Sequence, residues 1–347
     1  MRVIIGFSFC LAFATSGIAQ RAAKPERPSG SLLRHSAPIG PKSGVKTPGV
    51  QIPFASLKAE LEFETATAPE WIGFTDAIFI PNQTGDGLNR IDPRAKEVKL
   101  GEPLAGLKKP CGGIVNAFTA LWVANCGDGT LARIDPKTNK LAASIAAGVG
   151  TARRMIAATG DSIWLLSDTH GTLSRIDPQE KAVVAEFRVP ADCGSLIFGE
   201  TALWLACPAE NRVLRIDPAT NLIDKSIEVS AQPESLAIGE TSVWVLCGKD
   251  GKLERIDPKT NRVTKTIELG APAVGGTVTI GDGFAWAAMP GFPITRIDPA
   301  TDKVAQQFYG DASGPLLSAD GFLWLADAKS GKLLKIDPKR VIATLAE

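Results

Sequence analysis

Apolar residues occur along this chain in short runs and not in stripes at helical spacing. The runs are rich in Val, Ile, Leu and Trp, and they are separated by Gly, Pro, Asp and Asn. Such runs between turn signals are typical of strands. In residues 112–148, the segments GGIVNAF, ALWVAN, TLARID and KLAASIAAG predict four strands in succession, which we call strands A to D.

This four-strand pattern repeats seven times. The tetrapeptide RIDP, once written KIDP, recurs at spacings of 39 to 43 residues, and a large aromatic residue stands twelve or thirteen positions before each aspartate. The aspartates are Asp92, Asp135, Asp177, Asp217, Asp257, Asp298 and Asp337, and the aromatic residues are Phe79, Trp122, Trp164, Trp204, Trp244, Trp286 and Trp324. A period near 40 residues built from strands predicts an all-β fold, a seven-bladed β-propeller of four-stranded antiparallel blades.

Both repeated residue types are expected to serve the scaffold. Aspartate followed by proline favours a turn between strands C and D, because the carboxylate accepts a nearby backbone N–H and proline fixes the next φ. A tryptophan at a fixed place on strand B is expected to bury apolar area between neighbouring blades. We therefore interpret the aspartates as turn formers and not as metal ligands.

Composition divides the chain into three predicted segments. Residues 1–19 contain an early arginine, an apolar stretch and small residues before position 20, which is typical of a signal peptide. Residues 20–55 are rich in Pro, Gly and Lys and predict a flexible linker, and residues 56–347 predict the propeller. Export implies a periplasmic or secreted protein, and the apolar stretch is too short to be a transmembrane segment.

Two terminal segments compete for strand D of the last blade. The sequence SLKAELEFE at residues 56–64 has the pattern of such a strand, and so has RVIATLA at residues 340–346. We expect the N-terminal segment to close the ring.

Five cysteines follow the predicted signal peptide. In two blades, one cysteine stands at the start of strand A and another at the end of strand B. Antiparallel pairing brings these ends together, and an oxidising compartment favours a disulfide. The predicted pairs are Cys111–Cys126 and Cys193–Cys207. Cys247 is expected to stay a thiol, because Pro233 stands where its partner would be.

The overall charge excludes one class of partner. The chain has 38 basic and 37 acidic residues, and the basic residues are scattered. A nucleic-acid-binding protein needs a clustered basic surface, so we expect no nucleic-acid partner. We expect a monomer.

Residues that break the repeat mark the candidate site. The D to A loops and the B to C turns surround one mouth of the central channel, and the third blade has Arg153 and Arg154 there, where most blades have small residues. Glu70 and Glu234 lie in the corresponding region of the first and fifth blades. We predict that these four residues bind a ligand, and the paired arginines suit a carboxylate or a sugar.

The catalytic signal is weaker. Asp168 and His170 lie in the B to C turn of the third blade, and His170 is the only histidine in the predicted propeller. Histidine titrates near neutral pH and can carry a proton. The candidate catalytic residues are therefore His170, Asp168, Glu70 and Glu234, and no metal site is predicted from the spacing of Cys and His.

The repeat LWVANCGDGTLARIDPKTNKL resembles the repeats of YVTN-type and virginiamycin B lyase-like (streptogramin lyase-like) β-propellers, over about residues 62–347. The resemblance implies the propeller fold. For the lyases it also implies histidines and a glutamate around Mg²⁺ at the channel mouth, in the later blades. No histidine follows His170 in this chain, so those residues have no counterpart here.

Two functions remain open from the sequence. The first is an exported propeller that binds a small molecule or a protein partner at its channel face, without a cofactor. The alternative is a metal-assisted lyase or hydrolase that uses Mg²⁺ and the candidate catalytic residues.

Overall fold

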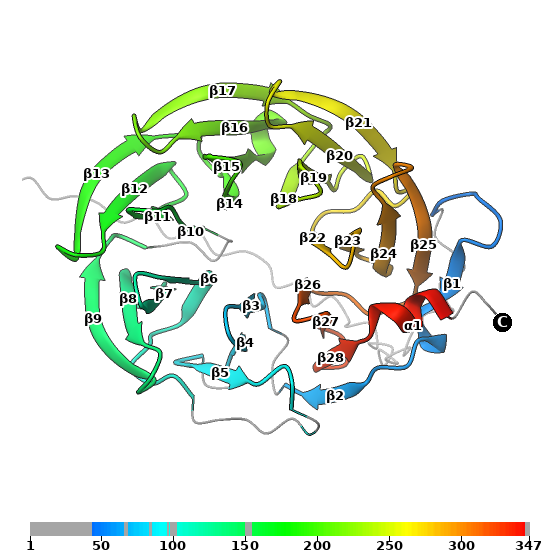
Figure 1. Cartoon of the computed structure of the whole chain (residues 1–347), viewed down its shortest axis with the longest axis horizontal. Helices are drawn as coiled ribbons and strands as arrows, with labels where there is room; N and C mark the ends of the chain where they lie inside the picture. Colours follow the sequence, from blue (N-terminus) through cyan, green and yellow to red (C-terminus); the bar gives the residue numbers. More distant parts are fainter. Residues whose placement is uncertain are drawn as a thin grey trace, which may run out of the picture. The chain divides into compact units, whose positions relative to one another are not determined.

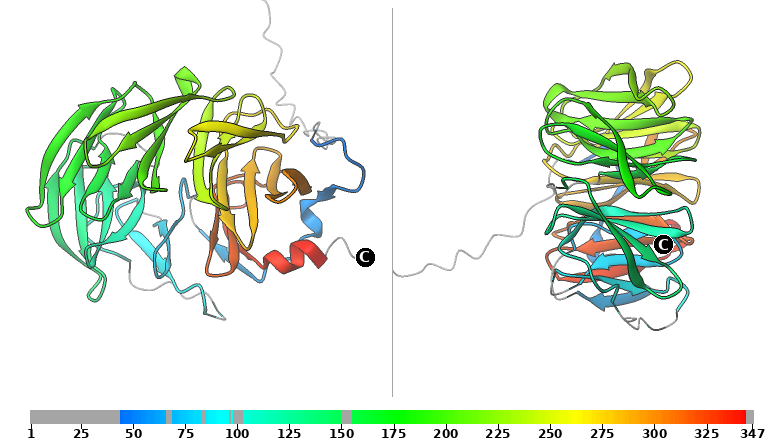
Figure 2. Two further views of the ribbon diagram at one scale, coloured as in Figure 1. Left: turned by 45° about the horizontal axis from the view of Figure 1, so that its top comes forward. Right: turned by 90° about the vertical axis from the view of Figure 1, so that its left-hand side faces the viewer.

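The computed structural model describes residues 44–65, 69–82, 85–95, 97, 103–149 and 155–343, and the side chains of residues 342–343 are outside this description. These described residues belong to one compact unit. Its strands are arranged as seven sheets around a centre, with strand A of each blade innermost and strand D at the rim (Figure 1). Figure 2 shows the blades at an angle and edge on. Among the described residues, no helix has the length and apolar character to cross a membrane.

The blades follow one another in chain order. The first blade holds β3 (Gly73–Phe74), β4 (Ile78–Pro81) and β5 (Leu88–Ile91). The second holds β6 (Pro110–Ala117), β7 (Ala120–Asn125), β8 (Thr130–Asp135) and β9 (Lys140–Ala146). The third holds β10 (Ile156–Ala158), β11 (Ile163–Leu166), β12 (Thr172–Asp177) and β13 (Ala182–Arg188). The fourth holds β14 (Gly194–Gly199), β15 (Ala202–Cys207), η2 (Pro208–Glu210), β16 (Arg212–Asp217) and β17 (Leu222–Glu228).

The remaining three blades contain both ends of the described chain. The fifth holds β18 (Pro233–Gly239), β19 (Ser242–Cys247), β20 (Lys252–Asp257) and β21 (Arg262–Glu268). The sixth holds β22 (Thr277–Gly281), β23 (Phe284–Met289), β24 (Phe292–Asp298), β25 (Lys303–Tyr309) and the added strand β1 (Gln51–Pro53), which η1 (Phe54–Ser56) follows. The seventh holds β26 (Leu316–Ala319), β27 (Phe322–Asp327), β28 (Lys332–Ile336) and β2 (Leu61–Glu64). The predicted seven-bladed, antiparallel propeller is confirmed.

The first blade has three strands within the described residues, and Leu104 pairs with Leu88 as a single bridge where strand D would lie. In the sixth blade, β1 pairs in parallel with the outer strand β25. β1 and the first two residues of η1 lie within residues 20–55, the predicted linker, and Ser56 is the first residue of the predicted propeller. The predicted signal peptide and the linker up to residue 43 lie outside the described residues.

The N-terminal segment closes the ring, as predicted. β2 pairs antiparallel with β28 and takes the place of strand D in the last blade. The described part of the competing C-terminal segment, residues 340–343, belongs to the helix α1 (Pro338–Ala343) and forms no strand.

The sequence of the last C to D region explains why the chain turns helical there. In five blades, the fourth residue after the RIDP aspartate has a left-handed φ of 55 to 60°, and four of these five residues are Asn or Asp. The corresponding residue in the last blade is Val341, and a β-branched side chain disfavours that conformation. Pro338 directly after Asp337 instead suits the first helical position.

The RIDP aspartates form turns, as predicted. In all seven blades, the aspartate accepts a hydrogen bond from the backbone N–H two residues later, at 2.7 to 2.9 Å. The N–H of Lys259, for example, holds the pKa of Asp257 below its ordinary value. This is the Asx-turn arrangement, and it leaves these carboxylates occupied by the scaffold.

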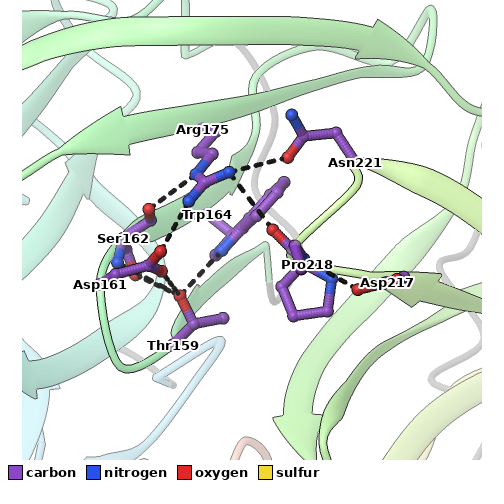
Figure 3. A network of polar contacts seen from close by, with 9 residues as sticks. Thr159, Asp161, Ser162, Trp164, Arg175, Asp217, Pro218 and Asn221 are labelled. Carbon is purple, nitrogen blue, oxygen red and sulfur yellow. Dashed lines mark hydrogen bonds and ion pairs between the residues drawn. The ribbon is translucent and has the colours of Figure 1, made fainter.

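The arginine of the same tetrapeptide links neighbouring blades. Arg175 lies over the ring of the fully buried Trp164, 5.4 Å from its centre, and its Nε donates to Ser162 Oγ at 2.7 Å (Figure 3). Its Nη1 reaches the next blade, where it donates to the carbonyl of Pro218 at 3.3 Å and to Asn221 Oδ1 at 3.1 Å. The motif therefore serves both as a turn and as a contact between blades.

Other junctions repeat this contact. Arg255 lies 4.8 Å from the ring centre of Trp244 and donates to the carbonyl of Pro299 at 2.8 Å and to Asp302 at 2.6 Å. In the last blade, Lys335 of KIDP donates to the carbonyl of Pro93 in the first blade, at 2.6 Å. This bond adds to β2 in joining the two ends of the ring.

Both predicted disulfides are present. Cys111 is joined to Cys126 with Cα atoms 5.9 Å apart, and Cys193 to Cys207 with Cα atoms 4.1 Å apart. Cys247 is a buried free thiol, and burial raises its pKa above the ordinary value. Two disulfides are consistent with an oxidising compartment outside the cytoplasm.

Replacing both cysteines of either pair by serine will lower the free energy of unfolding by about 3 kcal/mol, because each disulfide closes a loop of about 15 residues in the unfolded chain. Urea unfolding of the two double variants measures this loss. Cys247→Ala serves as the control for removing a cysteine that forms no disulfide. Equal unfolding midpoints for the parent and a pair variant would show that the corresponding disulfide does not stabilise the ring.

Candidate functional site

The candidate site is a cavity of about 320 Å³ at the mouth of the channel where the A strands begin. Glu70, from the first blade, and Glu234, from the fifth, both line it. The repeat therefore identified two residues that the fold brings to one cavity although they are far apart in the sequence. The remaining lining residues are Trp71, Gly194, Ser195, Pro208, Gln232, Ser235, Val274, Gly275, Gly276, Thr277 and Pro315.

A β-bulge places Glu234. In the pairing of β18 with β19, Pro233 lies opposite Cys247 and Ser235 opposite Leu246, so Glu234 is an extra residue without an opposite partner. A bulge bends the strand and changes the direction of its side chain, and bulges are frequent beside active sites. Glu234 is half-buried, whereas Glu70 is exposed in the loop before β3.

Hydroxyl groups tie the A strands together along the wall of the cavity. Ser195 Oγ accepts the backbone N–H of Leu236 at 2.9 Å, and Ser235 Oγ accepts that of Val278 at 3.1 Å. Thr277 Oγ1 accepts the N–H of Leu316 in the same way, at 2.9 Å. Each hydroxyl still has a proton that it can donate to a ligand.

A second cavity of about 290 Å³ adjoins the first and shares Glu70, Thr277 and the two glycines of the loop before β22. Gly276 has a φ of +144°, and a Cβ there would lie 2.8 Å from the carbonyl oxygen of Ala288. Only glycine permits this close approach. Met289 and Pro290 add apolar surface, so the mouth combines acidic, hydroxylated and apolar walls.

Two candidate residues of the third blade, Asp168 and His170, are described, and neither lines this cavity. Asp168 accepts the N–H and the hydroxyl of Thr172, at 2.9 and 2.8 Å, and so closes its own turn. Burial would raise the pKa of Asp168, but the hydrogen bonds from Thr172, together with the backbone N–H of His170 and the charge of Arg188, outweigh burial and lower the pKa. His170 is exposed. Arg153 and Arg154 lie outside the described residues, so their predicted role remains a prediction.

The described residues contain no cluster of three or more His, Cys, Asp or Glu side chains placed to hold a metal ion. Of the described residues that line this cavity, the acidic ones are Glu70 and Glu234.

Our sequence reasoning missed the hydroxyl residues. Ser195 and Ser235 stand nine positions before their blade's tryptophan, and this shared register was the signal that could have identified them. Gln232 and Trp71 have no such repeat, and only the folded chain shows that they line the cavity.

Solved structures with a similar fold include β-propeller lyases. A streptogramin B lyase structure aligns with 80% of this chain and 96% of its own, with a TM-score of 0.65 and 15% identity. Virginiamycin B lyase from Staphylococcus aureus gives the same TM-score and identity and aligns over 98% of its chain. BamB from Moraxella catarrhalis aligns with 77% of this chain and 82% of its own, with a TM-score of 0.57 and 13% identity.

No protein-family model and no curated protein matches the sequence. At these identities the similarity to solved structures concerns the fold. It confirms the β-propeller fold that the resemblance of the repeats to lyase-like propellers implied.

Proposed function

We propose that this chain is an exported binding propeller whose channel mouth binds a small hydroxylated molecule that carries an amine. The observation that carries the proposal is that Glu70 and Glu234 line one cavity. Two carboxylates accept hydrogen bonds and attract a cation, and a charge-assisted bond to an ammonium group is stronger than a neutral one.

The surroundings of the two glutamates favour a ligand with hydroxyl groups. Backbone N–H groups of the next blade hold the hydroxyl oxygens of Ser195, Ser235 and Thr277, so each hydroxyl has a fixed oxygen and a proton that can turn toward a ligand. Val274 is 72% exposed at the same mouth and offers apolar contact. The volume of about 320 Å³ is at the lower end of ligand cavities, which range from about 300 to 1,000 Å³.

The alternative, a lyase or hydrolase assisted by Mg²⁺, is supported by no additional observation. Mg²⁺ is often held by one or two carboxylates and several waters, so Glu70 and Glu234 are the residues that would hold it. Asp168 is committed to its turn, and His170 lies outside this cavity as described. Catalysis therefore stays a secondary proposal.

The location of the protein also belongs to the proposal. The composition of residues 1–19 supports a signal peptide, and the two disulfides support an oxidising, periplasmic or extracellular compartment. We propose that the exported protein acts as a monomer.

Glucosamine is the probe for the site, and N-acetylglucosamine is its neutral counterpart. At mildly acidic pH, glucosamine will raise the thermal unfolding midpoint more than N-acetylglucosamine does. Glu234→Gln will weaken glucosamine binding about tenfold or more, since a hydrogen bond to a charged group contributes about 1.5–3 kcal/mol. Isothermal titration calorimetry measures the affinities.

Glu228→Gln is the matched control, because it removes the same charge at the end of the rim strand β17. Equal affinities of the two variants for glucosamine, or equal binding of the two sugars, would contradict the proposal. A midpoint that rises with MgCl₂ in the parent and not in Glu70→Gln would favour the metal-assisted alternative.

A further inference from the structure

The opposite mouth of the channel has a different character. A cavity of about 530 Å³ lies where the A strands of the first four blades end, and most of its lining residues are apolar, while polar groups supply about half of its exposed wall. The wall includes Phe74, Ile114, Ile156, Ile197 and Phe198. This volume is within the range of ligand sites. Phe198 is 39% exposed there, so an aromatic ring at the mouth of the cavity is open to solvent.

The apolar surface continues from Phe198 into the next two blades. Ile238 and Ile280 occupy the same register, six residues before their blade's tryptophan. A Cβ on Gly199 would lie 2.7 Å from the side chain of Ile238, and a Cβ on Gly239 would lie 2.5 Å from that of Ile280. The ends of β14, β18 and β22 therefore lie against one another around the channel (Figure 1).

Carboxylates border this apolar surface. The turns that follow the three strands read FGET, IGET and IGDG, and they expose Glu200, Glu240 and Asp282. None of the ion pairs among the described residues involves these three side chains. In the first and third blades, by contrast, the turn aspartates pair with arginines, Asp76 with Arg90 at 2.5 Å and Asp161 with Arg175 at 2.7 Å.

We propose that this mouth, formed by Phe198, Ile238 and Ile280 with Glu200, Glu240 and Asp282, docks a segment of a protein partner in which an apolar side chain is flanked by lysines or arginines. The apolar side chain enters the cavity beside Phe198, and the cations meet the carboxylates of Glu200, Glu240 and Asp282. Charge complementarity selects a basic segment over an acidic one. The inference concerns the opposite mouth of the channel and does not depend on the proposed amine site.

Three fluorescein-labelled peptides test the surface: KKFKK, KKGKK and EEFEE. Fluorescence anisotropy will show that KKFKK binds most tightly, that KKGKK binds about tenfold more weakly without its aromatic side chain, and that EEFEE does not bind. The affinity of KKFKK will fall as salt rises, because exposed charges are screened.

Variants locate the binding. Phe198→Ala and the double variant Glu200→Gln/Glu240→Gln will each weaken KKFKK binding about tenfold. The double variant Glu228→Gln/Glu268→Gln removes the same charge from the ends of the rim strands β17 and β21, and it will bind KKFKK as the parent does. Thermal unfolding midpoints show that all the variants are folded.

Three results would overturn the proposal. The first is no binding of KKFKK to the parent. The second is an equal loss of KKFKK affinity in the two double variants, which would show that the net charge of the protein alone attracts the peptide. The third is equal binding of KKFKK and EEFEE, which would leave an apolar small molecule as the occupant of the cavity.

Discussion

A chain that begins at residue 65 will have a free energy of unfolding, measured in urea, about 3–5 kcal/mol lower than that of a chain that begins at residue 44. The truncation removes β1 and β2, and β28 then loses its outer partner. Phe63 of β2 is partly buried against the apolar cluster between the last and first blades, and it contributes part of the about 1.5–3 kcal/mol that full burial of such a side chain gives. Each lost backbone hydrogen bond contributes about 0.5–1.5 kcal/mol more.

A chain that begins at residue 57 distinguishes the contributions of the two strands to stability, since it lacks β1 and keeps β2. We expect it to lose less stability than the chain that begins at residue 65. The uncovered edge of β28 should also make the shortest chain prone to association, because an exposed strand edge is a template for pairing. Identical unfolding midpoints for the chains that begin at residues 44 and 65 would contradict closure by β2.

Trp244→Ala will lower the free energy of unfolding by about 3–5 kcal/mol, the range for removing a buried aromatic side chain. Trp244 is fully buried, and its Nε1 donates to the carbonyl of Gly239 at 3.1 Å. The guanidinium of Arg255 lies 4.8 Å from its ring centre and bonds to the sixth blade. The substitution therefore leaves a cavity and also loosens the contact between two blades.

Two further variants calibrate this loss in urea unfolding. Trp244→Phe keeps an aromatic ring, so its free energy of unfolding will fall by less than that of Trp244→Ala. Leu222→Ala, at a 65% exposed rim position, should change the free energy of unfolding by about 0.5 kcal/mol or less. A loss below about 1 kcal/mol for Trp244→Ala would show that the repeated tryptophan is not an anchor of the ring.

The repeat made most of the scaffold predictable. Each copy places the same residue type at the same register, so Asp257 could be interpreted as a turn former and Cys193 as the partner of Cys207 from a single chain. The same comparison located Glu70 and Glu234, because each departs from its register. Repeats of one sequence thus supply information on which positions the scaffold requires.

Features outside the repeat were less predictable. β1 is a three-residue strand in a segment rich in Pro and Gly, and its pairing with β25 depends on a partner more than 250 residues away. The bulge at Glu234 depends on the register between β18 and β19, which the sequence alone does not fix. The helix in place of a strand at residues 340–343 was foreseeable, because Val341 replaces the Asn or Asp found at that place in most blades.

Hydrogen exchange measured by mass spectrometry, with and without glucosamine, tests the central claim that this propeller binds its ligand at the mouth lined by Glu70 and Glu234. Glucosamine will slow amide exchange in residues 194–196, 232–236 and 275–278, which line that mouth, and this slowing will be absent in Glu234→Gln. Slowed exchange confined to the rim strands, or slowing that persists in Glu234→Gln, would contradict the claim.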